Sequence, residues 1–133
     1  MATRRIFARP NLIALAVVVL SVAALLAYRA WYVEPRVWGG LCAAADRPLA
    51  CIPRAGLLWL QHYYLWGLAA LALGLWAFLG GPFAAAVAAV ALGIGAVINY
   101  NATWGMIGAA LGFFFILVLR LRPTILRLST LPV

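Results

Sequence analysis

The sequence predicts an all-α fold, an integral membrane four-helix transmembrane bundle with short loops. Two observations predict it. Of the 133 residues, 68% are hydrophobic and only 9% are charged. The apolar residues also fall into four runs, each near the length that crosses a bilayer. A chain this short has too little interior to hide so much apolar surface from water. No linker divides it, so we expect a single transmembrane domain over residues 1–133.

The expected spans are residues 11–33, 57–78, 83–98 and 103–119. A hydrocarbon core of about 30 Å takes about 20 helical residues. The third and fourth runs are a little short, so we expect their polar flanks to lie in the headgroup zone. Gly80, Gly81 and Pro82 predict a tight turn between the second and third spans. Residues 34–56 form the expected outer loop, the one segment outside the membrane with room for a function.

Arginines at both ends of the chain predict its topology. The two flanks of the bundle lack acids and carry Arg4, Arg5 and Arg9 on one side and Arg120, Arg122 and Arg127 on the other. An even number of spans puts both ends on one side of the membrane, and the positive-inside rule makes that side cytoplasmic. The outer loop complicates this reading, because it holds further charges: Arg36, Arg47, Arg54, Glu34 and Asp46, with Arg29 at its edge.

The net charge of +8 would suggest nucleic acid as the partner of a soluble protein. Here the arginines lie at the ends of apolar runs, where cations meet lipid phosphates, so we expect membrane lipids and no nucleic acid. The lysine-free, Ala/Leu/Arg-rich composition favours a bacterial inner membrane. A secretory signal peptide also fits the basic start followed by Leu12–Ala27. The run is long for such a segment and residues 28–32 are a poor cleavage site, but the sequence leaves retention of the first span open.

Cys42 and Cys51, the chain's two cysteines, both fall in the expected outer loop. Outside the cytoplasm such a pair is normally oxidised, so we expect a disulfide that closes the loop. The four-span plan with an outer cysteine pair is similar to that of thiol oxidases of the DsbB type, a likeness of topology only. Those enzymes use two cysteine pairs, and this chain has one. A metal site is not expected, because zinc needs four closely arranged ligands.

Polar and aromatic residues gather at the outer end of the predicted bundle. On a continuous second helix, Trp59, His62 or Tyr63, and Trp66 share one face, and Tyr100 and Trp104 approach the same level from the next outer turn. One interpretation is an aromatic belt at the headgroup level. The other is a ligand or lipid pocket, since an ionisable residue within a span is a functional hypothesis. Haem would need a second axial ligand from Met106 or a partner, because His62 is the only histidine.

Small residues recur at helical spacing in the third and fourth spans, and they are Ala85, Ala89, Gly93, Gly108 and Gly112. Such spacing lets another helix approach closely. The pattern is common in apolar sequences, and it fits packing within this chain or a face for self-association or for a partner helix.

These observations favour a small non-catalytic inner-membrane protein, an accessory or partner-binding subunit of a membrane complex. Its small-residue faces would dock, and the outer loop would offer Arg36, Trp38 and Arg47 to a partner. No catalytic residues are expected, because no carboxylate pair or Ser/His/Asp set is present and no charge lies in the middle of a span. No cofactor is expected either. One alternative is a quinone- or haem-binding redox component centred on His62. A further alternative is an oligomeric carrier of lipid or a small molecule.

Overall fold

The computed structural model describes residues 9–128, with their side chains as far as residue 119. This part of the chain is all-helical and holds no strand. The elements are α2 (Arg9–Tyr28) with one π-helical turn, η1 (Arg29–Val33), then α3 (Arg36–Ala43), α4 (Cys51–His62), α5 (Leu65–Phe78), α6 (Phe83–Ile98) and α7 (Ala102–Leu128).

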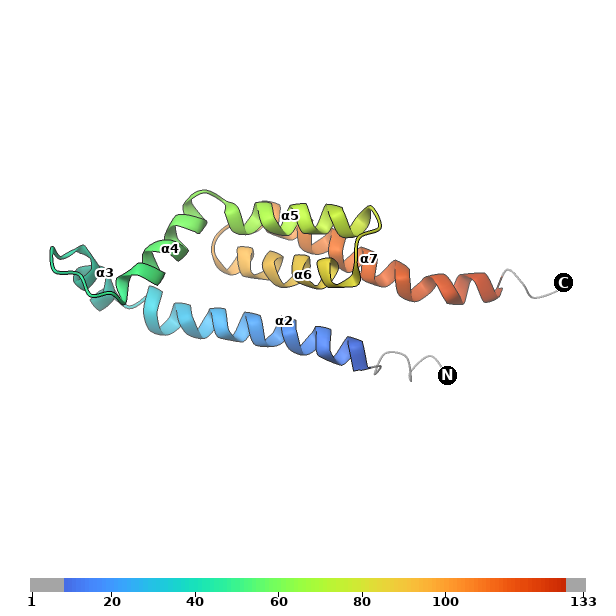
Figure 1. The fold of residues 1–133 in the computed structure, drawn as a ribbon, viewed down its shortest axis with the longest axis horizontal. Helices are drawn as coiled ribbons and strands as arrows, with labels where there is room; N and C mark the ends of the chain where they lie inside the picture. Colours follow the sequence, from blue (N-terminus) through green and yellow to red (C-terminus); the bar gives the residue numbers. More distant parts are fainter. Residues whose placement is uncertain (1–8, 129–133) are drawn as a thin grey trace.

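Three helices, α5, α6 and α7, pack against one another, and α2 lies along α6 (Figure 1). Successive long helices run in opposite directions, so the start of α2 and the end of α7 lie at the same end of the molecule. The other end carries Arg29, the α6–α7 turn and α4, and it is called the Arg29 end below. The segment α3–α4 extends beyond it.

The centre of the three-helix unit is built from small residues. Ala70, Ala77, Ala86, Ala89 and Ala96 are fully buried. A Cβ placed on Gly93 would lie 2.5 Å from the carbonyl oxygen of Gly105, and one placed on Gly74 would lie 2.5 Å from that of Gly108. The helix backbones are therefore in direct contact at these points, which is the close approach that small residues permit.

Two helices are long and apolar enough to cross a membrane: Arg9–Val33, with mean hydropathy 2.4, and Ala102–Leu119, with mean hydropathy 2.1. The helices α5 and α6 are apolar but shorter, at 14 and 16 residues. No residue of α2 is buried. One side of α2 is half-buried where the helix lies along α6, and the rest of its apolar surface is exposed.

The expected continuous helix over residues 57–78 is wrong. The structure divides it at Tyr63 and Tyr64, and Tyr64 has φ 57 in the left-handed region. The Tyr64 N–H donates to the Gln61 carbonyl oxygen at 3.2 Å, which ends α4, and the Tyr64 carbonyl accepts from the Leu68 N–H at 3.0 Å, which begins α5. A left-handed residue changes the direction of the chain, so α4 leaves the bundle axis (Figure 1).

Two further boundaries differ from expectation. Residues 34–56 hold α3 and the first half of α4, so the expected outer loop is largely helical. The last helix does not end near residue 119 but continues to Leu128. Of the arginines that predicted the topology, Arg4 and Arg5 lie outside the described residues, and so do the side chains of Arg120, Arg122 and Arg127.

A substitution at Gly108 tests the backbone contact between α5 and α7. A Cβ there would overlap the backbone of Ala70 and Leu71. Gly108→Ala should lower the free energy of unfolding by about 1–3 kcal/mol, the usual effect of overpacking. Thermal unfolding in detergent, followed by circular dichroism, measures it. Gly40→Ala is the matched control, because nothing lies within 4 Å of a Cβ there. Equal stability of the two variants would contradict the contact.

Candidate functional site

Arg29 lies at the point where α2 meets the end of α6, and it is only 7% exposed. One terminal nitrogen, Nη1, donates to the carbonyl oxygen of Ile98, the last residue of α6. The other, Nη2, lies 3.2 Å from Oε1 of the exposed Glu34. A cation at the C-terminus of a helix is stabilised by the helix dipole and by the carbonyls that lack intrahelical partners. Arg29 therefore caps α6 from η1.

Tyr100 completes this contact from the α6–α7 turn. Its ring centroid lies 4.9 Å from the Arg29 guanidinium carbon. Tyr100 has φ 58, and the Asn101 N–H donates to the Ala96 carbonyl at 2.7 Å, as in a Schellman helix end. Glycine usually takes this position, because an L-residue there costs about 1–2 kcal/mol. The attraction between the Arg29 guanidinium and the face of the Tyr100 ring is a physical reason for tyrosine instead of glycine at this position.

Two buried asparagines lie in the α6–α7 turn, and each donates a hydrogen bond to a helix carbonyl oxygen. Asn99 is fully buried, and its Nδ2 donates to the Gly95 carbonyl oxygen at 2.9 Å. Asn101 is 3% exposed, and its Nδ2 donates to the Gln61 carbonyl oxygen at 3.3 Å. Asn99 therefore caps the last turn of its own helix, and Asn101 caps the last turn of α4 from the α6–α7 turn. Both asparagines fall between the third and fourth expected spans, and nothing in the sequence signals this role.

Cys42 and Cys51 are at disulfide distance, with their sulfur atoms 2.04 Å apart and their Cα atoms 5.6 Å apart. The bond joins the end of α3 to the start of α4, and we call residues 36–62 the α3–α4 hairpin. Two contacts hold the hairpin to η1 and the end of α2. The Tyr32 hydroxyl donates to the Ala50 carbonyl oxygen, and Nη2 of Arg54 donates to the Val33 carbonyl oxygen at 3.3 Å.

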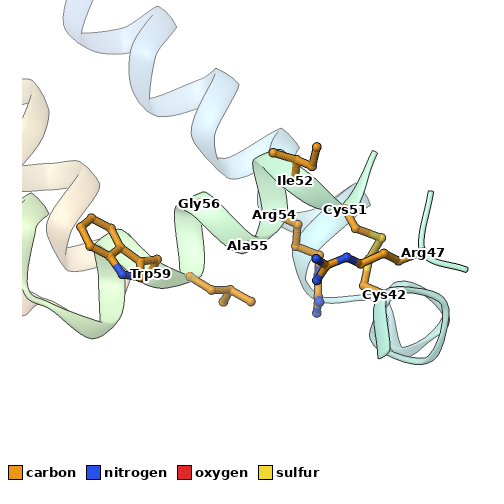
Figure 2. A pocket seen from close by; sticks show the side chains of 9 residues that line it. Cys42, Arg47, Cys51, Ile52, Arg54, Ala55, Gly56 and Trp59 are labelled. Carbon is orange, nitrogen blue, oxygen red and sulfur yellow. A yellow bond between two sulfur atoms is a disulfide. The ribbon is translucent and has the colours of Figure 1, made fainter. Parts of the chain in front are cut away.

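A cavity of about 520 Å³ lies beside the disulfide (Figure 2). Both cysteines line it, and so do two arginines, Arg47 and Arg54. Its apolar wall includes Ile52, Leu58 and Trp59. Figure 2 shows both arginine side chains extending into the region next to the disulfide. The cavity is therefore open to a ligand with an anionic part and an apolar part.

The residues of the predicted aromatic pocket lie in four places rather than one. Trp59, His62 and Tyr63 stay together on α4, with ring centroids 4.9 Å apart for Trp59–Tyr63 and 5.0 Å apart for His62–Tyr63. All three side chains are exposed. The break at Tyr64 separates Trp66, which lies beside Gly95, from these residues. Trp104 lies against Gly67, and Tyr100 lies over Arg29.

The small residues expected to mediate helix packing all contact other helices of the same chain. Ala85, Ala89 and Gly93 are buried in α6. A Cβ on Gly112 would lie 2.8 Å from the Ala86 carbonyl oxygen, and one on Gly108 would meet the backbone of Ala70. These faces of α6 and α7 therefore leave no room for a helix from another chain.

The described residues hold no group of three or more His, Cys, Asp or Glu side chains that could bind a metal ion. Comparison of the chain with protein-family models, with curated proteins and with solved structures finds no match. The function of the site is therefore inferred from its own residues. They form two features, the buried arginine that caps α6 and the cavity lined by two arginines.

Removing the Arg29 guanidinium tests the cap. Arg29→Met keeps a side chain of similar length but leaves the Ile98 carbonyl without its donor. The free energy of unfolding should fall by about 1–3 kcal/mol, the effect of an unpaired buried polar group. Thermal unfolding in detergent measures it. Glu34→Gln removes only the exposed partner and should change stability by less than about 1 kcal/mol. Comparable losses from both variants would mean that the ion pair, not the cap, holds α2.

Proposed function

We propose that this chain is a small multi-pass membrane protein with both termini cytoplasmic, acting as a non-catalytic accessory subunit that binds a larger membrane complex. One observation carries the membrane assignment. The segment Arg9–Val33 is strongly apolar, and of its residues only Arg29 is buried within the chain. Lipid is the solvent that covers such a surface without cost.

The remaining spans of the proposal are α5, α6 and α7. A helix of 14 or 16 residues is shorter than the roughly 20 that cross the hydrocarbon core. Local thinning of the bilayer accommodates short spans at modest cost. The exposed aromatic rings of Trp59 and Tyr63, next to the start of α5, fit the level of the lipid headgroups.

The partner-binding role is supported by the α3–α4 hairpin, which extends beyond the Arg29 end (Figure 1). Two apolar side chains of the hairpin are largely exposed: Val37 is 70% exposed and Leu49 is 83% exposed. Beyond the spans, lipid tails do not cover such side chains, so a protein surface is the occupant that fits. The α3–α4 hairpin is thus the docking element of the proposal, because the small-residue faces of α6 and α7 pack within the chain.

Leu49→Ser tests the partner-binding role. The protein is purified from its native membrane in a mild detergent, and co-purifying proteins are quantified. A stoichiometric membrane-protein partner should be present and should fall about tenfold in Leu49→Ser, as for an interface anchor. Leu79→Ser is the matched control, because Leu79 is 82% exposed but lies between α5 and α6, at the opposite end of the bundle.

The alternatives give other results in the same experiment. A redox component centred on His62 would carry a haem spectrum or an extractable quinone that is lost in His62→Ala. An oligomeric carrier would run as a defined oligomer without a partner. Either result, or a partner lost equally in Leu49→Ser and Leu79→Ser, would contradict the accessory-subunit proposal.

A further inference from the structure

We propose that the cavity beside the Cys42–Cys51 disulfide binds the phosphate group of an anionic phospholipid. The inference rests on the membrane assignment proposed above and does not need the accessory-subunit role. It rests on three properties of the cavity: its two arginines, the absence of an acidic residue from its lining, and its apolar wall.

The charge of the cavity favours an anion. Arg47 and Arg54 line the same space, and both acids of the chain lie elsewhere. Glu34 pairs with Arg29, and Asp46 is exposed and does not line the cavity. Two guanidinium groups without a counter-charge repel each other, and a phosphate that accepts hydrogen bonds from both removes that repulsion. Arginine is the side chain best suited to this contact.

One of the two arginines is held by a hydrogen bond. Nη2 of Arg54 donates to the Val33 carbonyl oxygen, so this side chain is held between α4 and η1. Arg47 is exposed and lies in the eight-residue segment that the disulfide closes into a loop. The first turn of α4, with Cys51 and Ile52, lines the same cavity, and its helix dipole adds positive potential there.

The rest of the lining favours a lipid over a free phosphate. Ile52, Leu58 and Trp59 form an apolar wall and are all exposed. The volume of about 520 Å³ is in the range of about 300–1,000 Å³ typical of sites for organic ligands. Such a space holds a lipid headgroup with its glycerol backbone, and Trp59 is the kind of residue that lies at the level of lipid headgroups.

The test counts lipid bound to the full-length protein. Protein purified in detergent is titrated with phosphatidylglycerol, and bound lipid is measured by native mass spectrometry, with phosphatidylcholine and inorganic phosphate as separate arms. One phosphatidylglycerol should bind more tightly than phosphatidylcholine. Arg47→Gln should weaken it about tenfold, the effect of one charge-assisted contact. Arg36→Gln is the matched control, an exposed arginine of α3 outside the cavity.

A second variant blocks the cavity without changing charge. Gly56 lines the cavity, and nothing lies within 4 Å of a Cβ built on it. Gly56→Leu should therefore fold, because a leucine also favours the helix, and should fill the space and weaken lipid binding. Gly40→Leu, equally open but on α3 outside the cavity, is its control.

The arms of the experiment separate the ligands. Loss of phosphatidylglycerol in Arg47→Gln and Gly56→Leu, but not in their controls, supports the proposal. Equal lipid binding in all four variants would place the lipid elsewhere and overturn it. Saturation by inorganic phosphate that fully displaces the lipid would make free phosphate the ligand, and the lipid assignment would be wrong.

Discussion

The Arg29 guanidinium is the contact on which the arrangement of the chain depends. The helix that precedes it, α2, has no buried residue, so apolar packing alone does not fix its position along α6. Arg29 fixes one end by donating to the Ile98 carbonyl and lying over the Tyr100 ring. The contact with Arg29 offsets the energetic cost of the left-handed Tyr100 backbone. It also fixes η1, so that Arg54 can donate to the Val33 carbonyl oxygen. The position of the α3–α4 hairpin therefore follows from this cap.

The three-helix unit follows a different rule. Its helices approach until backbones touch, at Gly93 and Gly105 and at Gly74 and Gly108. These contacts bury the small-residue faces of the helices. The large apolar side chains, such as Phe113 and Trp76, are therefore exposed on the outer surface of the three-helix unit. An apolar outer surface of this kind is stable when lipid or another protein covers it. The surfaces left for a partner are consequently the outer faces and the α3–α4 hairpin.

The sequence predicted the helical class and the pairing of Cys42 with Cys51, because apolar runs and a lone cysteine pair are strong local signals. The break at Tyr63 and Tyr64 was missed, because neither glycine nor proline marks it. That miss also misplaced the aromatic pocket, whose residues share a face only on a continuous helix. Arg29 was taken for a charge at a span edge, since nothing local shows that the end of α6, almost seventy residues later, needs a cap.

The proposed membrane bundle carries its disulfide-closed hairpin on the outer side. Labelling of Cys42 and Cys51 with a membrane-impermeant maleimide, in intact spheroplasts, tests this topology. A hairpin on the outer side should give no labelling of untreated cells and full labelling after reduction, with no further increase when the membrane is opened. Cysteines that react without reduction, or that react only after the membrane is opened, would contradict it.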